Sequence, residues 1–176
     1  MFIAIDAFTN VSGQFKTLQS VFKIVEKTTK TFGAQGEVVD PAYKVTTPDT
    51  ILIQGVLDNG AAATLSLRSS ATTADDVGFR WIISGTEGEV IFTGGVGFIQ
   101  NGIADTKIQF RKWGSGAEDV EFGGEDTGGL TGSPLSIARL YEAFASGDSE
   151  GYATIDQSLL TEKLLEDVVK SAVWAP

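Results

Sequence analysis

Because the chain contains no histidine and no cysteine, its side chains that could do chemistry are carboxylates, amines, hydroxyls, phenols, guanidiniums and indoles. This composition excludes imidazole bases, thiolate nucleophiles, disulfides and Cys/His metal sites. A Ser-His-Asp triad is excluded for the same reason. The groups that remain can orient a substrate and stabilise developing charge through hydrogen bonds.

Four residues are candidates for catalytic roles. Asp6 lies in an otherwise apolar segment and is either a residual general acid or a carboxylate that favours a helix start. Arg80, with Ser84 on the same strand face, could hold a carboxylate or carbonyl oxygen, or belong to a hydrated strand face or dimer interface. Tyr43 and Tyr141 supply hydroxyl donors that could polarise a carbonyl.

The candidates for substrate binding are aromatic residues of the predicted strands, together with an arginine. Large aromatic side chains usually fill a core, yet a curved aromatic sheet face can also hold an apolar metabolite. Arg68 lies beside Ser66 on a polar strand face and could bind an oxygen of that metabolite. The aromatic candidates are Phe79, Trp81, Phe92, Phe98 and Trp113.

The spacing of apolar residues predicts the elements that must position these side chains. The sequence predicts a helix, a long strand, two β-hairpins, a further strand, a glycine-rich loop and two more helices. The first helix covers residues 3–11, and the long strand covers 15–30 and frays into 28–36. The hairpins pair 50–57 with 61–68 and 79–84 with 89–93, and the further strand covers 106–113. The loop covers 114–132 with a short β-like piece at 120–122, and the last two helices cover 134–146, with Ser133 as N-cap, and about 154–173. This order predicts an α+β fold in one domain over residues 1–176, with a mostly antiparallel open sheet and helices packed on one face.

Three segments carry a resemblance to a known family. They read IDAFTNVSGQFKTLQSVFK at 5–23, TPDTILIQGVLDNGAAATLSLR at 47–68 and FRWIISGTEGEVIFTG at 79–94. The chain resembles the C-terminal domain of the Gfo/Idh/MocA oxidoreductases, and in these segments its sequence is most similar to the fungal branch of galactose-repressor-like proteins. The resemblance implies the same α+β fold.

The sequence departs from that family in two ways. Full-length members carry an N-terminal Rossmann domain for a dinucleotide, and nothing here resembles it; the initiating Met suggests a naturally short protein. The family's GGHxxD motif reads Met1-Phe-Ile-Ala-Ile-Asp6 here, so Asp6 is retained and the histidine is missing. We therefore expect no nucleotide cofactor, no metal and no redox activity of the chain alone.

These observations leave three functional hypotheses. The first is a cofactor-independent enzyme that guides a small hydrophobic metabolite through an isomerisation, cyclisation or pericyclic step, as in secondary metabolism. The second is a non-catalytic ligand-binding or regulatory dimerisation domain. The third is a partner of a separately encoded nucleotide-binding subunit.

Charge and hydropathy restrict the partners. The formal net charge of −10, with scattered Lys and Arg, argues against nucleic acid. No apolar run reaches the length of a membrane span and no signal peptide precedes the fold, so we expect a cytoplasmic protein without a membrane partner. Ile82, Ile91 and Trp113 on the second sheet face predict a homodimer through that face.

Overall fold

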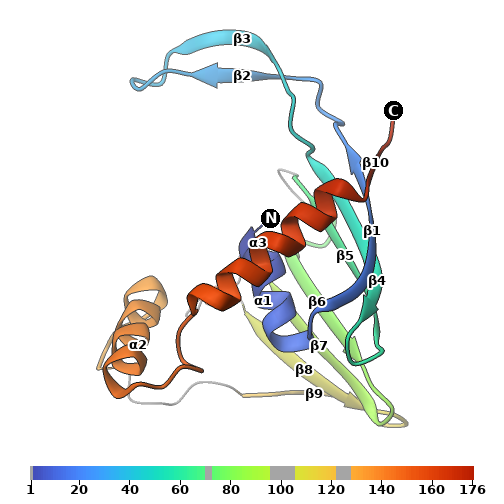
Figure 1. Ribbon diagram of the computed structural model, residues 1–176, viewed down its shortest axis with the longest axis vertical. Helices are drawn as coiled ribbons and strands as arrows, with labels where there is room; N and C mark the ends of the chain where they lie inside the picture. The colour runs from blue at the N-terminus through green and yellow to red at the C-terminus, as the bar shows by residue number, and fades with distance from the viewer. Residues whose placement is uncertain (1, 70–72, 96–105, 122–127) are drawn as a thin grey trace. The chain divides into compact units, whose positions relative to one another are not determined.

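The computed structural model describes residues 2–69, 73–95, 106–121 and 128–176, which form two compact units (Figure 1). Unit 1 comprises Met1–Ser70 and Ile155–Pro176, and unit 2 comprises Ala71–Thr154. Unit 1 is therefore discontinuous in sequence, because unit 2 is inserted between its fifth strand and its last helix.

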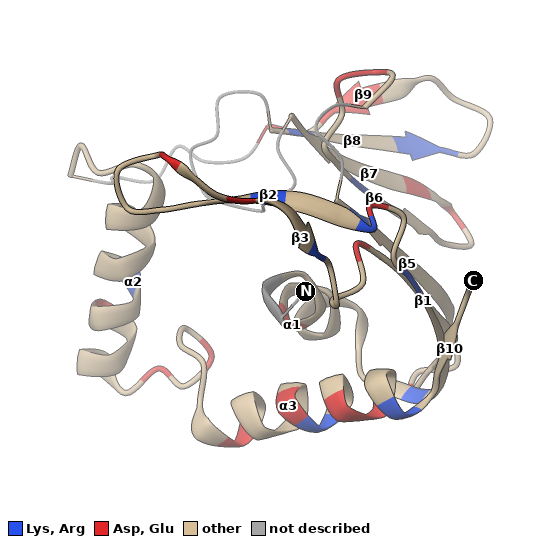
Figure 2. Cartoon of the chain, turned by 90° about the horizontal axis from the view of Figure 1, so that it is seen from above, with Lys and Arg blue, Asp and Glu red and all other residues tan. Residues whose placement is uncertain are grey.

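Unit 1 is built on a four-stranded sheet with the order β10-β1-β4-β5. Strands β1 (Phe15–Lys23), β4 (Thr50–Leu57) and β5 (Ala62–Arg68) are antiparallel, and β10 (Ala172–Trp174) lies parallel to β1. Helices α1 (Phe2–Ser12) and α3 (Ile155–Lys170) cover one face of this sheet, as seen in Figure 1 and, from above, in Figure 2. The predicted α+β class, with a mostly antiparallel open sheet and helices on one face, is confirmed.

The core of unit 1 lies between those helices and the sheet. Ile5 of α1, Phe22 of β1, Ile53 of β4, and Leu164 and Val168 of α3 form one buried cluster. Strand residues alternate between two faces, so every second residue of β1, β4 and β5 points into this core. The other face of the sheet is consequently left to solvent.

The predicted long strand 15–30 is wrong, because β1 ends at Lys23 and residues 28–44 form a separate hairpin. We call this hairpin the arm; it consists of β2 (Thr28–Phe32) and β3 (Val38–Lys44), which pair with each other in a two-stranded sheet (Figure 1). Pro41 disfavoured a strand assignment from the sequence. In the structure a register shift near Pro41 accommodates it, and Tyr43 lies in β3.

The arm is fixed to the sheet by the carboxylate of Asp49. Its oxygens accept the backbone N–H of Val25 at 2.9 and 3.0 Å and that of Glu26 at 2.8 Å, and the hydroxyl of Thr50 at 3.1 Å. The N–H groups of Glu26 and Val25 hold the pKa of Asp49 below its ordinary value of 3.8. Asp49 thus joins the segment that leads from β1 into the arm to the segment that leads from the arm into β4.

The end of the chain also differs from the prediction. The last helix ends at Lys170, and the next residues form β10, whose Trp174 packs edge-on against Phe22 with ring centroids 5.5 Å apart. Of the apolar residues of this helix, Leu164 and Val168 are buried, whereas Leu159, Leu160 and Val169 are exposed. The helical spacing of apolar residues in the sequence does not by itself tell which of them face the core and which lie beside it.

Unit 2 contains a second antiparallel sheet and one helix. The strands are β6 (Phe79–Ser84), β7 (Gly88–Gly94), β8 (Lys107–Lys112) and β9 (Ala117–Asp119), paired in that order. The predicted hairpin and the strand after it are confirmed, although β9 precedes the β-like piece expected at 120–122. Among the described residues, no helix is both long and apolar enough to cross a membrane.

Helix α2 (Gly132–Ser146) begins earlier than predicted. Its N-cap is Thr131 rather than Ser133, and the Thr131 side chain makes no capping hydrogen bond. The predicted stop is confirmed, since Gly147 takes the left-handed conformation at φ 74° that favours glycine at a helix end.

Replacing Ile53 by alanine should lower the free energy of unfolding by about 2–5 kcal/mol, because the change leaves a cavity in the buried cluster. Val11→Ala is a suitable control, since Val11 lies exposed on α1 and its loss should cost less than about 0.5 kcal/mol. Urea unfolding followed by circular dichroism measures both variants. An equal loss of unfolding free energy in the two variants would contradict the position of the core.

The arm should loosen in acid. A carboxyl group whose pKa is lowered in the folded state stabilises that state above its unfolded pKa, and this contribution is lost as the pH falls through the folded-state value, which here lies below 3.8. NMR titration should show the Val25 and Glu26 amide signals changing together with the Asp49 carboxyl, and Asp49→Asn should abolish this change. An Asp49 midpoint at or above 3.8 would contradict the described hydrogen bonds.

Candidate functional site

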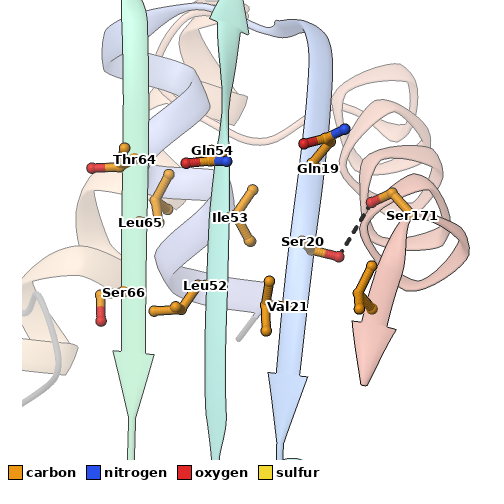
Figure 3. A pocket seen from close by; sticks show the side chains of 11 residues that line it. Gln19, Ser20, Val21, Leu52, Ile53, Gln54, Thr64, Leu65, Ser66 and Ser171 are labelled. Carbon is orange, nitrogen blue, oxygen red and sulfur yellow. Dashed lines mark hydrogen bonds between the residues drawn. The ribbon is translucent and has the colours of Figure 1, made fainter. Parts of the chain in front are cut away.

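A trough lies on the solvent-facing side of the unit 1 sheet (Figure 3). One hollow of this trough measures about 430 Å³, and a neighbouring one on the same sheet measures about 500 Å³. Strand pairing arranges its side chains in rows across the sheet: Gln19 lies opposite Gln54, which lies opposite Thr64. The next row contains Val173, Val21, Leu52 and Ser66.

The trough contains no charged side chain among its lining residues, although the whole chain carries 23 acidic and 13 basic residues. Apolar side chains on this face are left open to solvent: Leu52 is 44% exposed, Val56 41% and Val173 66%. Amide and hydroxyl groups lie between them. Such a surface can bind by shape and by neutral hydrogen bonds, but it offers no group that would change charge during a reaction.

Arg68 borders this trough. It lies opposite Thr50, which in turn lies opposite Lys23, so the two cations occupy the row beyond Leu52 and Ser66. The predicted neighbourhood of Arg68 and Ser66 on one strand face is confirmed by their positions two residues apart on β5. Any oxygen that Arg68 binds would lie at one end of the uncharged surface.

Asp6 lies on the opposite, helix-covered side of unit 1. The hydroxyl of Thr161 on α3 donates a hydrogen bond of 2.7 Å to Asp6 Oδ1, and Thr161 is buried. This bond ties α1 to α3. The arrangement gives Asp6 a structural partner, and it separates Asp6 from Arg68 on the outer face and from Tyr43 on the arm.

Three of the predicted aromatic candidates, Phe79, Trp81 and Phe92, share one face of the unit 2 sheet. Trp81 lies directly opposite Phe92, and the rings of Phe79 and Phe92 meet edge-on with centroids 5.3 Å apart. Neighbouring side chains on the same face are also apolar, namely Ile83, Val90, Ile108 and Phe110. We call these seven residues the aromatic face. Phe98 lies outside the described residues.

Arg80 points away from the aromatic face, because it lies between Phe79 and Trp81 on the same strand. Its guanidinium donates a hydrogen bond of 2.6 Å to the Asp75 carboxylate, and this contact lowers the pKa of Asp75. Strand alternation therefore places Arg80 and the three aromatic candidates Phe79, Trp81 and Phe92 on opposite faces of the sheet. Within unit 2, Arg80 and those aromatic side chains cannot hold the same ligand.

The remaining candidates are distributed over other elements. The indole N–H of Trp113 donates to the carbonyl oxygen of Gly85 at 3.1 Å and so fastens the end of β8 to the β6–β7 turn. Tyr141 lies on α2 and is 67% exposed, and Tyr43 is about half exposed on the arm. The described residues include no group of three or more Asp or Glu side chains that could hold a metal ion.

Sequence reasoning missed the row formed by Gln19, Gln54 and Thr64. The predicted β4–β5 hairpin already placed Gln54 and Thr64 on the same face by strand alternation. Gln19 could not be added, since the pairing of β1 with β4 joins segments that lie about 35 residues apart in sequence. Figure 3 shows the three side chains side by side across the strands.

Comparison with known proteins identifies the fold. Residues 3–94 match a family model described as Gal80p, C-terminal domain. No curated protein matches the chain by sequence. Among solved structures, a super-repressor mutant of Gal80p from Saccharomyces cerevisiae is 19% identical with a TM-score of 0.71, and the match covers 96% of this chain and 45% of that one.

Two bacterial structures are also similar. An NAD-binding oxidoreductase from Klebsiella pneumoniae is 15% identical with a TM-score of 0.69, covering 95% of this chain and 46% of that one. The WlbA dehydrogenase from Bordetella pertussis, solved with NADH and UDP-GlcNAcA, is 15% identical with a TM-score of 0.57, covering 96% and 40%.

The chain thus spans less than half the length of each of these solved proteins. At these identities the structural likeness shows the fold, and it confirms the predicted resemblance to the C-terminal domain of the Gfo/Idh/MocA oxidoreductases. The family model matches more than half of the 176 residues. The chain belongs to the family of the Gal80p C-terminal domain.

Proposed function

We propose that this chain is a non-catalytic, regulatory binding module that self-associates through the trough face of unit 1. The observation that carries the proposal is the uncharged surface formed by β1, β4, β5 and β10 in a chain with a net charge of −10. The cores of protein interfaces are depleted of charged residues and enriched in apolar ones. A regulatory role is in keeping with the similarity to Gal80p.

A second copy of the chain is the partner that this surface suits best. Two molecules that each carry a charge of −10 repel one another, so close contact is least costly where both surfaces are uncharged. A two-fold axis would place the same rows of side chains against each other. Exposed Leu52 and Val56 would then be buried, and Gln19 and Gln54 would exchange amide hydrogen bonds.

The face expected from the sequence to form the dimer is less suitable. Ile82 and Ile91 do lie opposite each other on one face of the unit 2 sheet, as predicted. The same face, however, carries charged side chains from all four strands: Arg80, Glu89, Lys107, Arg111 and Asp119. Desolvating these charges would oppose association.

Leu52→Lys should raise the dimer dissociation constant at least about tenfold, because it would bury an unpaired ammonium group on each side of the interface. Ile82→Lys makes the same charge change on the unit 2 sheet and should leave self-association unchanged. Light scattering across a concentration series measures both, and circular dichroism verifies folding. A wild-type chain that stays monomeric at about 100 μM would contradict the proposal.

A second candidate function is supported by the aromatic face of unit 2. Phe79, Trp81 and Phe92 could hold the carbon skeleton of a small hydrophobic metabolite in a folded conformation. The chain would then act as a cofactor-independent enzyme for an isomerisation, cyclisation or pericyclic step, in which orientation provides most of the acceleration.

Titration with a terpenoid alcohol such as farnesol, followed by tryptophan fluorescence, tests this candidate. Trp81→Ala should weaken binding about tenfold through lost contact area, whereas Ile82→Ala, on the opposite face, should not. Gas chromatography of the incubated ligand detects any rearranged product. Binding that is not saturable, or that both variants weaken equally, would contradict a ligand site on the aromatic face.

A further inference from the structure

The turn that ends α1 and the turn between β4 and β5 are locked together. The Asn59 side-chain amide donates to the Ser12 carbonyl oxygen at 3.0 Å, and the Asp58 N–H donates to the Gln14 carbonyl oxygen at 2.8 Å. Gly13 suits this turn, because its φ of +99° is a conformation that other residues rarely adopt, and a Cβ there would also crowd the Asp58 side chain, 2.5 Å from Oδ1. We call these contacts the α1 latch.

The latch contains an Asn-Gly pair, Asn59-Gly60. In such a pair the backbone nitrogen of the glycine can attack the asparagine Cγ, because glycine has no Cβ to hinder the approach. The new N–C bond closes a succinimide while the Gly60 nitrogen loses its proton and ammonia leaves. Water then adds across either C–N bond of the ring, giving aspartate or isoaspartate at position 59.

In the folded chain, hydrogen bonds hold both reacting groups. The Gly60 N–H donates to the Leu57 carbonyl oxygen at 3.0 Å. The Asn59 amide is held at both ends, since its Oδ1 accepts from the Ala61 N–H at 3.0 Å while its nitrogen donates to Ser12. Attack on Cγ therefore requires this turn to open, although both residues are exposed to the water and hydroxide that the reaction uses.

We infer that Asn59-Gly60 is a deamidation site that the α1 latch protects, and that its conversion irreversibly releases the end of α1. The product replaces the amide donor with a carboxylate. That carboxylate would face the Ser12 carbonyl oxygen, beside the Asp58 carboxylate and at the negative end of the α1 dipole, so it would be repelled where the amide was bound. This inference does not depend on either proposed function.

The chain provides its own reference for the rate. Asn101-Gly102 is a second Asn-Gly pair, and in concentrated urea both pairs should react at similar rates. In the native protein Asn59 should react at least about tenfold more slowly than in urea, because only the open fraction of the turn reacts. Peptide mapping by mass spectrometry at pH 8 and 37 °C follows each site. Equal Asn59 rates in native buffer and in urea would overturn the protection.

Gly13→Ala should accelerate the reaction at Asn59 in the native protein, because alanine at a φ of +99° strains the turn whose Ser12 and Gln14 carbonyl oxygens the latch binds, and its Cβ would crowd the Asp58 side chain. Gly36→Ala is the matched control: it also places alanine at a glycine with positive φ, but its Cβ would contact nothing within 4 Å. The Asn59 rate in this control should match the wild type. Acceleration in both variants, or in neither, would overturn the role of the latch.

Asn59→Asp reproduces one reaction product directly. Hydrogen exchange measured by mass spectrometry should become faster in peptides that cover α1, while peptides from β1 and β4 keep their protection. This measurement also tests the inference if Gly13→Ala fails to fold. Unchanged exchange in α1 would overturn the release of the helix.

Discussion

The packing of α3 against β1 is the interaction on which the rest of the described structure depends. Val168 and Leu164 pack with Phe22 and Ile53, and the buried Ser20 hydroxyl donates to the Val168 carbonyl oxygen across 148 residues of sequence. Closing so long a loop costs conformational entropy that only a well-buried cluster can offset. The same closure aligns β10 beside β1 and thereby completes the sheet whose outer face forms the trough.

In each sheet, the alternation of side chains along the strands places groups of different chemistry on opposite faces. In unit 1 one face buries the core against α1 and α3, and the other presents uncharged amides, hydroxyls and short apolar chains. In unit 2 one face is aromatic and the other carries Arg80 with its partner Asp75. This separation favours recognition over catalysis, because groups that were expected to act together lie on different surfaces.

Local contacts complete the architecture where burial cannot. The arm leaves Phe32, Val38 and Val39 exposed, and the Asp49 carboxylate fixes its base by accepting backbone hydrogen bonds from Val25 and Glu26. The α1 latch similarly joins two turns that are exposed to solvent. Both devices depend on one polar side chain with more than one partner, which makes them sensitive to pH or to chemical change.

Much of the fold could be predicted from the sequence. The hairpins at 50–68 and 79–94 follow from alternating apolar residues on either side of turn glycines, and α1 and α2 follow from helical spacing that ends at Gly13 and Gly147. The arm could not be predicted, because a threonine-rich strand and a strand containing Pro41 give weak local signals. Strand β10 could not be predicted either, since its three residues continue the apolar pattern of the preceding helix.

The sequence by itself determined which chemistry is available: without histidine or cysteine, the chain is limited to carboxylates, amines, hydroxyls, phenols, guanidiniums, amides and indoles. Alternation along a single strand also determined that Arg80 and Trp81 face opposite ways. Only the tertiary structure decided which side chains meet across strands, such as Gln19 with Gln54, and that Thr161 binds Asp6. The physical reason is that local patterns depend on neighbours within a few residues, whereas these pairings depend on burying a core assembled from distant segments.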